Sequence, residues 1–310
     1  MNTTITPYIG RFAPSPSGPL HFGSLIAALA SYLDAKHHDG QWLVRMEDID
    51  PPREEAGAAE NILASLKAHQ LHWDGEVMYQ SQRLDAYANA LATLDSTTYF
   101  CRCGRQQLLE LRGIYDGRCR SQHITPSDTV MTSTRIRTDA LTAADMLIAE
   151  HYLDLFQGEQ QQSLQREVGD FILRRKDNLV AYQLAVVCDD IAQGITHIIR
   201  GSDLLSSTPR QRYLSLLLTQ KMGINYTLPL YGHIPVASNK FQQKLSKQHK
   251  AQPLNNADAF NNLCRALTFL HHSPPTEIVA QAQIPALLTW AKQHWQRKNI
   301  PQALSFVVEE

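Results

Sequence analysis

The chain has 310 residues, of which 43% are hydrophobic and 19% are charged, and its formal net charge at pH 7 is −1. A chain of this length contains about two domains, and this composition supports a substantial core rather than a disordered chain. The balanced charge excludes a histone-like protein that binds nucleic acid through bulk positive charge, whereas an enzyme with a local basic face is consistent with it.

The N-terminus and the cysteines bear on the cellular compartment. Residues 1–10 contain neither a basic segment nor an apolar run of the kind that directs secretion. No apolar run approaches the roughly 18 residues that a membrane helix needs, so we expect no membrane partner. Three of the five cysteines fall between residues 101 and 119, and in a protein that is not exported this crowding favours a metal site over disulfides. We therefore expect a cytoplasmic protein.

The N-terminal part of the chain is predicted to form a strand, a helix, a second strand and a second helix. Prolines make the turn after the first strand incompatible with a helix, and apolar residues at helical spacing follow it. This order opens a doubly wound, Rossmann-type parallel sheet, so we expect an α/β fold. The predicted elements are a strand at 8–12, a turn at 14–19, a helix from Leu25 to a stop at Asp39-Gly40, a strand at 42–46 and a helix at 54–69.

The middle of the chain has a different pattern. From about Asp74 to Glu167 a predicted helix at 82–94 is followed by polar segments rich in Thr and Gln, which indicates an insertion between two halves of the sheet. We expect residues 160–162, three glutamines in a row, to form an exposed loop. The later predicted elements are strands at 171–173, 195–199 and 231–236, helices at 209–222, 257–270 and 285–295, and a loop at 240–250.

The turn between the first strand and the first helix is the main candidate site. Backbone N–H groups and the positive end of the helix attract an anion at such a turn. Gly18 and Gly23 leave room for a nucleotide, and His21 can donate a hydrogen bond to a phosphate oxygen as charge develops. Taken alone, a histidine in this position is more often a capping or core residue than a ligand-binding one.

A second segment, Lys244-Leu245-Ser246-Lys247, completes the candidate site. Two ammonium groups on a loop can neutralise a leaving pyrophosphate. Taken alone, such a loop would be interpreted as a solvated run of charge. Because the two segments occur at the first helix and after the last predicted strand of the sheet, we interpret them together as a triphosphate site.

These segments resemble the two signatures of the class I aminoacyl-tRNA synthetases. Residues 11–24, Arg-Phe-Ala-Pro-Ser-Pro-Ser-Gly-Pro-Leu-His-Phe-Gly-Ser, resemble the HIGH signature in its glutamyl variant, and residues 244–248, Lys-Leu-Ser-Lys-Gln, resemble KMSKS. Residues 45–50, Arg-Met-Glu-Asp-Ile-Asp, narrow the resemblance to the glutamyl and glutaminyl group. Ser24 and Gln248 depart from the signatures, and most synthetases have His at the position of Ser24. The resemblance covers about residues 10–250.

The resemblance implies ATP, accompanied by magnesium, as a substrate, and a ligase as the class of enzyme. It implies that His21 and Lys247 are catalytic. The matching positions for ATP are Pro14, Gly18, His21, Gly23, Ser24, Lys244 and Lys247.

A glutamate pocket needs groups for two carboxylates and one ammonium. Glu47, at the end of the second predicted strand, suits the ammonium, and Arg11 and Arg200 can make bidentate contacts with carboxylates. An alternative for Arg200 is a surface ion pair with Asp203. By similarity to the family, the glutamate-binding positions are Arg11, Ala13, Ser15, Glu47, Tyr182 and Arg200.

The clustered cysteines predict a structural zinc site. Zinc prefers four ligands in a tetrahedron, and Cys101, Cys103 and Cys119 would supply three thiolates. His123 is the chemically ordinary fourth ligand, whereas resemblance to the glutamyl-queuosine enzymes points to Tyr115. Redox-active or inert cysteines are the alternatives.

The part of the chain after the KMSKS-like loop also bears on function. A full glutamyl-tRNA synthetase continues into a large helical anticodon-binding domain, whereas here only residues 251–310 follow. This resembles the glutamyl-queuosine tRNA(Asp) synthetase family, in which ATP activates glutamate and the product is esterified to queuosine at the wobble base of tRNA(Asp). The resemblance implies that the anticodon arm takes the place of an acceptor arm. The alternatives are a shortened synthetase that charges tRNA(Glu), another nucleotidyl transferase, and an RNA-binding module that has lost catalysis.

Together these predictions divide the chain into four regions. Two halves of a catalytic domain are separated by an acceptor- and zinc-binding subdomain, and a small helical element that contacts an RNA stem follows. The predicted boundaries are 1–74, 75–167, 168–250 and 251–310.

Overall fold

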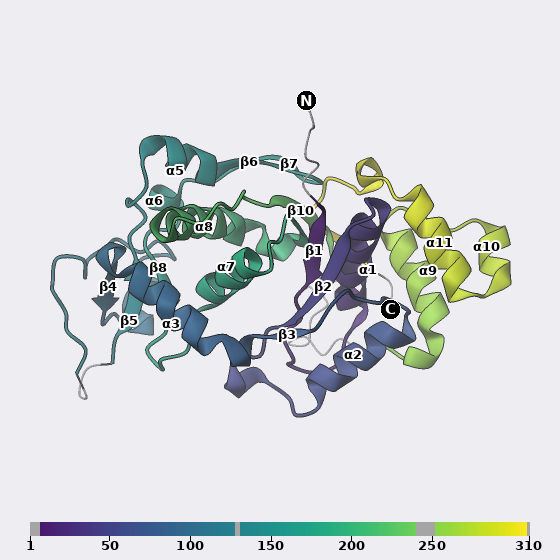
Figure 1. Ribbon diagram of the computed structural model, residues 1–310, viewed down its shortest axis with the longest axis horizontal. Helices are drawn as coiled ribbons and strands as arrows, with labels where there is room; N and C mark the ends of the chain where they lie inside the picture. The colour runs from purple at the N-terminus through teal and green to yellow at the C-terminus, as the bar shows by residue number, and fades with distance from the viewer. Residues whose placement is uncertain (1–6, 128–130, 240–251, 309–310) are drawn as a thin grey trace.

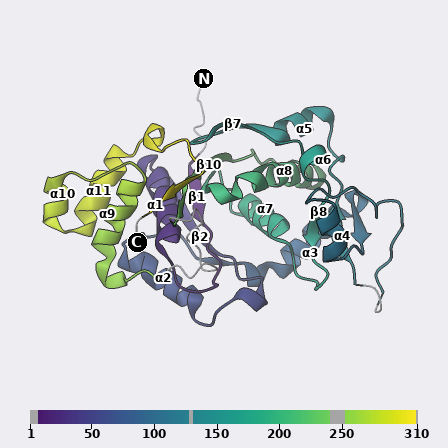
Figure 2. The ribbon, with the colours of Figure 1, turned by 180° about the vertical axis from the view of Figure 1, so that it is seen from behind.

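A computed structural model describes residues 7–127, 131–239 and 252–308. The parallel strands lie in the middle of an elongated molecule (Figures 1 and 2). Short antiparallel strands and helices lie at one end, and a group of helices formed by the last part of the chain lies at the other. No helix in these described ranges is long and apolar enough to cross a membrane.

The parallel strands form two pieces that meet edge to edge. In the first piece β1 (Ile9–Phe12) pairs with β2 (Gln41–Met46), which pairs with β3 (Met78–Tyr79). In the second, β9 (His197–Gly201) pairs with β10 (Leu230–Ile234). The Thr196 N–H donates to the Ile9 carbonyl at 2.9 Å and so joins the two pieces. The predicted strand–helix–strand opening is confirmed, with parallel pairing throughout.

Helices cover both faces of the parallel strands. On one face, α1 (Phe22–His37) packs against the apolar side chains Trp42, Val44 and Met46 of β2. On the opposite face, charged side chains of β1 and β2 meet α7 (Tyr182–Ala192), so α1 and α7 flank the strands (Figure 1). Because successive side chains of β2 point to opposite faces, the strand contributes to an apolar core on one side and to a buried polar layer on the other.

The antiparallel end of the molecule differs from the sequence prediction in two places. The predicted strand at 171–173 belongs to β8 (Phe171–Arg174), which pairs antiparallel with β5 (Ser133–Ile136) and not with the parallel strands. The expected loop at 160–162 is wrong for its first two glutamines, which lie in β7 (Gly158–Gln161). This strand forms a hairpin with β6 (His151–Asp154), in which backbone pairing satisfies polar groups whatever the side chains.

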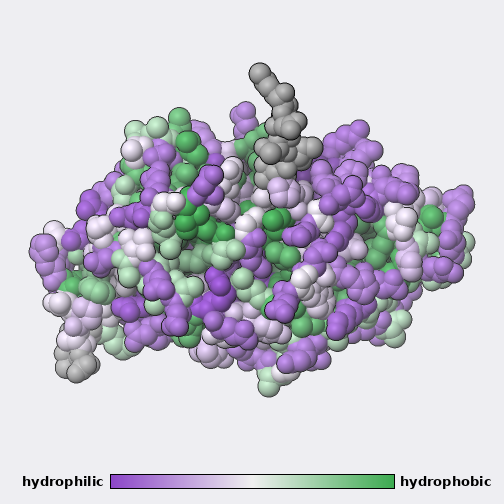
Figure 3. Space-filling model, in the orientation of Figure 1, coloured by the Kyte–Doolittle hydropathy of each residue, from purple (hydrophilic) through white to green (hydrophobic). Residues whose placement is uncertain are grey.

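The remaining elements complete this end of the molecule. Buried apolar side chains of α7 and α8 (Thr208–Met222), Leu184, Val187 and Leu214 among them, pack into a second core with Phe171 of β8. The helix predicted at 209–222 is therefore confirmed as α8. The other elements of this end are α3 (Leu84–Thr93), β4 (Thr98–Cys101), α4 (Arg105–Glu110), α5 (Ala143–Glu150) and α6 (Leu164–Glu167). By contrast, α2 (Ala58–Ala68) packs Ile62 and Leu66 into the core around α1. Apolar side chains reach the surface over α5 (Figure 3), where Leu147 and Ile148 are exposed.

The last part of the chain packs against α1. Asp34 of α1 accepts hydrogen bonds from Tyr8, Trp295 and Arg297, with both Arg297 contacts below 3.0 Å. This buried carboxylate therefore fastens the C-terminal segment to the N-terminal one. The elements of this part are α9 (Ala259–Phe269), α10 (Thr276–Gln281), α11 (Ile284–His294) and β12 (Ser305–Val307), which pairs in parallel with β11 (Val236–Ser238).

Candidate active site

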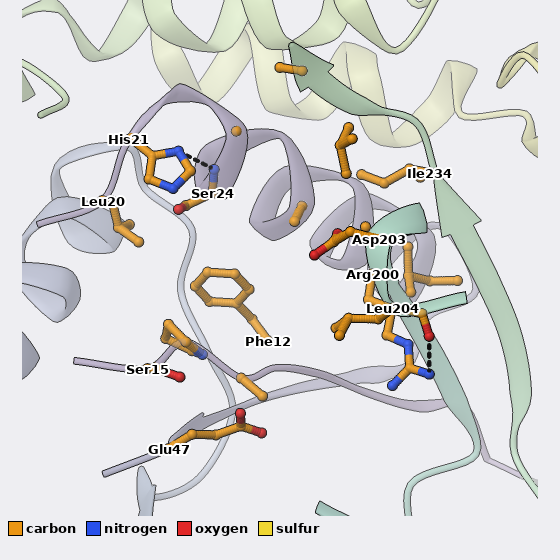
Figure 4. Close-up of a pocket in the computed structure, with 18 of the residues that line it drawn as sticks. Phe12, Ser15, Leu20, His21, Ser24, Glu47, Arg200, Asp203, Leu204 and Ile234 are labelled. Carbon is orange, nitrogen blue, oxygen red and sulfur yellow. Dashed lines mark hydrogen bonds between the residues drawn. The ribbon is translucent and has the colours of Figure 1, made fainter. Parts of the chain in front are cut away.

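A cavity of about 760 Å³ opens at the carboxyl ends of β1 and β2 and takes residues from both parallel pieces. Figure 4 shows His21 and Ser24 on one side of the opening and Arg200 and Leu204 on the other, with Glu47 at the bottom of the view. Ligands bind at this edge of open α/β sheets. The predicted site residues that line it are Arg11, Ala13, Pro14, Ser15, His21, Gly23, Ser24, Glu47, Tyr182 and Arg200.

Three of the predicted site residues are not among the described residues that line this cavity. Gly18 lies in the turn before α1 with a φ of 122°, a backbone conformation that favours glycine, so its role is conformational. Lys244 and Lys247 lie outside the described residues. The described chain stops at Asn239, after β11, and resumes at Gln252.

The chain on either side of residues 240–251 reaches the cavity. Val236 and Ala237 of β11 line it before the interval. After the interval, Pro253 forms an antiparallel bridge with His21, and the Leu254 N–H donates to the Leu20 carbonyl at 2.9 Å. The described residues before this interval therefore line the cavity, and those after it contact Leu20 and His21 of the HIGH-like segment.

His21 caps α1 and faces the cavity at the same time. Its Nδ1 accepts a hydrogen bond from the Ser24 N–H at 3.2 Å, as a helix cap does. In a neutral ring whose Nδ1 is an acceptor, the proton is on Nε2. The capping alternative and the donor role predicted from the sequence are thus compatible, because the cap fixes the tautomer that can donate from Nε2.

Arg11 is held by a buried carboxylate that sequence analysis did not identify. Its Nε donates to Asp190 Oδ1 at 3.2 Å, and the same oxygen accepts from Arg45 Nη1 at 2.7 Å. Burial opposes ionisation of Asp190, but attraction to Arg45 and Arg11 outweighs it and lowers the pKa of this carboxyl. The Nη atoms of Arg11 make no hydrogen bond with any described residue, so the end of its guanidinium remains available in the cavity.

Glu47 shares this charged layer. Its Oε1 lies 3.6 Å from Arg45 Nη2, and its side chain is only 10% exposed. Burial raises the pKa of Glu47, although Arg45 and Arg11 oppose the shift. A substrate ammonium in the cavity would favour the ionised carboxylate in the same way.

Asp189, next to Asp190 on α7, connects the charged layer of Arg11, Arg45 and Glu47 to the residues that follow β3. Asp189 is fully buried and accepts from Gln80 at 2.8 Å, Arg83 at 2.6 Å and Tyr87 at 2.8 Å. Its other neighbour is Arg45 Nε at 3.8 Å. The paired acids of α7 therefore anchor two different parts of the fold, one of which presents Arg11 to the cavity.

Arg200 is buried and is not part of a surface ion pair, because only 5% of it is exposed. Its Nε donates to His233 Nε2 at 2.9 Å, and its Nη atoms donate to Gln211 at 2.7 Å, to Thr208 at 2.7 Å and to the Leu204 carbonyl at 3.3 Å. Four of its five N–H groups therefore have partners among the described residues, which leaves one for a substrate. In this arrangement the predicted bidentate contact would require displacement of a present partner.

His233, which accepts from Arg200, is itself held in place by Asp154. Its Nδ1 lies 2.5 Å from Asp154 Oδ2, and both side chains are fully buried. Burial lowers the pKa of His233 to about 4 despite Asp154, so the ring is neutral at pH 7. The neutral ring donates from Nδ1 to Asp154 and accepts at Nε2 from Arg200, which fixes the orientation of the guanidinium.

Tyr182 is the first residue of α7. It lines the cavity, and burial raises the pKa of its hydroxyl, which therefore stays protonated and can donate a hydrogen bond at neutral pH. The charges of Arg200, Glu47 and Arg11 all act on it. Tyr182 therefore lies in the same cavity as the other glutamate-binding positions that the family resemblance implies.

The clustered cysteines form a separate, buried group. The Sγ atoms of Cys101, Cys103 and Cys119 all lie within 4.8 Å of one another. The Tyr115 hydroxyl lies 3.3 Å from Cys101 Sγ and 3.8 Å from Cys103 Sγ, whereas His123 is exposed and is not in the group. Three buried thiols and a phenol thus surround one point, which is a donor set suited to zinc.

Comparison with known proteins decides the family. A family model described as "tRNA synthetases class I (E and Q), catalytic domain" matches residues 9–268. The glutamyl-Q tRNA(Asp) synthetase of Thiobacillus denitrificans (strain ATCC 25259 / T1) is 50% identical to this chain over 302 residues, which cover 94% of this chain and 95% of the relative. That of Pseudomonas aeruginosa (strain PAO1) is 46% identical, covering 97% and 98%.

The chain belongs to the glutamyl-Q tRNA(Asp) synthetase family. A glutamate–tRNA synthetase from Elizabethkingia anophelis has a similar structure, with a TM-score of 0.76 at 21% identity, and the match covers 98% of this chain and 68% of that one. This likeness shows the class I synthetase fold. The glutamyl-Q tRNA(Asp) synthetase family is the one predicted from the two signatures taken together with the short segment that follows the KMSKS-like loop.

Proposed function

We propose that this chain is an ATP-dependent ligase that activates L-glutamate as glutamyl-adenylate and transfers the glutamate to queuosine at the wobble position of tRNA(Asp). The observation that carries the proposal is that one cavity brings His21 of the HIGH-like segment together with Glu47 and Arg11. Relatives named for this activity are 45–50% identical to the chain over nearly its full length.

The cavity supplies a partner for each charge of glutamate. Glu47 would accept the α-ammonium, and the unengaged Nη atoms of Arg11 would make a bidentate contact with one carboxylate. Arg200, with one N–H left, and the Tyr182 hydroxyl would hold the other. Ala13 and Ser15 line the same cavity, and we propose them as further contacts.

ATP would occupy the part of the cavity next to the start of α1. We propose that Pro14, Gly23 and Ser24 line its binding site and that His21 Nε2 donates to a phosphate oxygen. Lys244 and Lys247 are proposed to neutralise the β- and γ-phosphates, and magnesium accompanies ATP as part of the substrate. Gly18 would keep the turn in the required conformation.

The proposed reaction has two steps, each of which transfers a group between substrates. An oxygen of the glutamate α-carboxylate attacks the α-phosphorus of ATP, the bond to the β-phosphate oxygen breaks, and pyrophosphate leaves. A hydroxyl of the queuosine ring then attacks the adenylate carbonyl carbon, AMP leaves with the bonding electrons, and the hydroxyl proton passes to solvent or phosphate. No side chain acts as a nucleophile, so the protein contributes orientation and charge.

We further propose that the cysteine group binds one structural zinc through Cys101, Cys103, Cys119 and Tyr115. The fit rests on three buried thiols within 4.8 Å and a hydroxyl beside them. Zinc would stabilise this region by fixing the chain between β4 and β5. The arrangement favours Tyr115 over His123, because the His123 side chain is exposed.

For the RNA, we propose that the anticodon arm of tRNA(Asp) lies across the region of residues 75–167 and the helices of 251–310. The catalytic halves would then be residues 1–74 and 168–250, with β1, β2, β9 and β10 in one doubly wound sheet. A tRNA substrate also places the protein in the cytoplasm.

The test is transfer of radiolabelled glutamate to two preparations of tRNA(Asp), one with queuosine and one without, and to tRNA(Glu). The proposal expects label only on the queuosine-containing tRNA(Asp). Label on tRNA(Glu) would support the alternative of a shortened glutamyl-tRNA synthetase. Glutamate-dependent ATP–pyrophosphate exchange, measured alongside, separates an active enzyme from an RNA-binding module.

A further inference from the structure

A second cavity, of about 310 Å³, lies beside the first and is lined by several residues with an unpaired buried polar atom. Of the described buried side-chain atoms that lack a hydrogen-bond partner, three belong to residues that line this cavity: Arg135 Nε, Gln183 Oε1 and Arg210 Nε. Buried polar atoms are normally paired, so such a group indicates a ligand or a functional constraint. The volume is at the lower end of the range for small-ligand pockets.

The two cavities share the first turns of α7 and α8. Tyr182 lines the first cavity, and the next residue, Gln183, lines the second. On α8, Arg210 lines the second cavity, and the next residue, Gln211, holds Arg200 of the first. A molecule that fills the second cavity is therefore a close neighbour of one that reacts in the first.

The second cavity has positive charge that no described acid offsets. Arg210 forms no ion pair with a described residue, and its hydrogen bond runs from Nη2 to the Ser206 carbonyl at 3.1 Å. Burial lowers the pKa of Arg210, and no described acid opposes that shift. Asp170 lines the cavity but is engaged by Arg120 and by the Tyr99 hydroxyl, each at 2.6 Å or less. Arg210 is half-buried, and a guanidinium with a buried Nε and no anion beside it is unfavourable, so an incoming anion would relieve this.

The walls of the cavity suit a nucleobase. The Arg135 guanidinium lies 3.8 Å from the centre of the Tyr115 ring, and Gln183 offers an amide. Unstacked RNA bases pack on such planar and apolar surfaces and pair with amides, while arginines bind the phosphates. The apolar wall consists of Leu108, Leu111, Ile114, Val168, Phe171 and Ile172.

We propose that this second cavity binds one unstacked nucleotide of the substrate RNA, adjacent to the nucleoside that receives glutamate, with Arg210 on its phosphate and Gln183 on its base. The proposal rests on the proposed function, because that function supplies the RNA. A nucleoside attacked in the first cavity must leave the base stack, and its neighbour in the chain then lies close to the second.

The experiment compares Arg210→Gln with Arg212→Gln. Arg212 is a matched control, because it lies on the same helix and also has a buried Nε without a partner, but it donates to the Ile148 carbonyl and does not line the cavity. Three quantities are measured: glutamate-dependent pyrophosphate exchange without RNA, the KM for queuosine-containing tRNA(Asp) in glutamate transfer, and the salt dependence of binding of that tRNA.

For Arg210→Gln we expect exchange within twofold of wild type and a KM for tRNA raised at least about tenfold, as for loss of one charge-assisted hydrogen bond. The slope of log K against log salt should shrink by about 0.7, the value for one phosphate contact on a single strand. Gln183→Glu places a carboxylate in the same cavity as Arg210 and should also raise the KM for tRNA. It is the test variant if Arg210→Gln does not fold. Arg212→Gln should keep all wild-type values.

A wild-type KM in both cavity variants, or an equal loss in Arg212→Gln, would overturn the nucleotide site. Failure of the proposed function is a different result: the wild-type enzyme would then transfer no glutamate to this tRNA. Even in that case, the affinity of each variant for the tRNA, compared with that of the wild type, still tests whether the second cavity binds RNA.

Discussion

Replacement of Asp190 by Asn tests the charged layer that presents Arg11 to the cavity. The substitution keeps the shape of the side chain but removes the charge that faces Arg11 at 3.2 Å and Arg45 at 2.7 Å. Removal of one partner of a buried ion pair usually costs about 3–5 kcal/mol. Because Glu47 and Asp189 remain 3.6 Å and 3.8 Å from Arg45, we expect the lower end of this range, about 3 kcal/mol.

The assays are urea unfolding and glutamate-dependent pyrophosphate exchange. We expect the free energy of unfolding to fall by about 3 kcal/mol. The KM for glutamate should rise about tenfold, because Arg11 loses the contact that orients it. The matched control is Asp177→Asn, whose carboxylate forms an exposed ion pair with Arg175 at 2.7 Å and should change stability by less than about 1 kcal/mol.

The difference in free energy of unfolding between wild type and Asp190→Asn should depend on pH, and its direction follows from the pKa of Asp190. Burial opposes ionisation of Asp190, but the arginines lower its pKa in the folded protein. Its ionisation therefore contributes stability above the ordinary aspartate pKa of about 3.9, and this contribution is lost as the pH falls through the lowered value. The gap between wild type and Asp190→Asn should thus narrow in acid. A variant with wild-type stability and wild-type KM at pH 7 would refute the reasoning.

Three further changes test other parts of the site. Lys247→Ala should lower pyrophosphate exchange at least about tenfold, as expected when one cation that stabilises the transition state is lost; unchanged exchange would remove Lys247 from this role. Asp154→Asn should reduce the fraction of His233 in the tautomer that accepts from Arg200. The KM for glutamate should then rise about tenfold while the KM for ATP stays constant. Equal changes in the two KM values would argue against this role of Asp154. Cys119→Ser should reduce bound zinc from about one ion per chain to a small fraction and lower the melting temperature, whereas Cys264→Ser, outside the cluster, should not.

Three of the residues that sequence analysis identified are held close together by local chain geometry, whereas Tyr182 and Arg200, from the second half of the chain, were predicted from the family resemblance alone. His21 and Arg11 are presented by a single strand-to-helix turn, and Glu47 follows the neighbouring parallel strand, so their meeting at one edge of the sheet could be predicted. Their spacing along the chain and the family signature carried the prediction. Residues of this kind depend little on how the rest of the molecule packs.

The residues that it missed depend on tertiary packing. Asp189 and Asp190 are adjacent acids on a helix, a pattern that usually indicates a solvated surface, and only the docking of α7 onto β1 and β2 buries them. His233 becomes a positioning residue because β6 brings Asp154 beside it. A signal existed in Arg45, a charged residue within an otherwise apolar strand, which predicts a buried acidic partner.

The errors in element assignment have a similar origin. The apolar run at 171–173 correctly predicted a strand, but nothing in a short run specifies which sheet the strand joins or its direction. In the hairpin of β6 and β7, β7 has no apolar side chain and β6 has its two apolar residues, Tyr152 and Leu153, side by side, so neither strand shows the alternation by which strands are usually predicted.

The central claim concerns where the glutamate is attached, and the most direct measurement is mass spectrometry of the product. The tRNA(Asp) would be incubated with the enzyme, ATP and glutamate, digested to nucleosides, and analysed for added glutamyl mass. The account predicts that the mass is found on queuosine alone. Glutamate on the 3′-terminal adenosine, with unmodified queuosine, would contradict it.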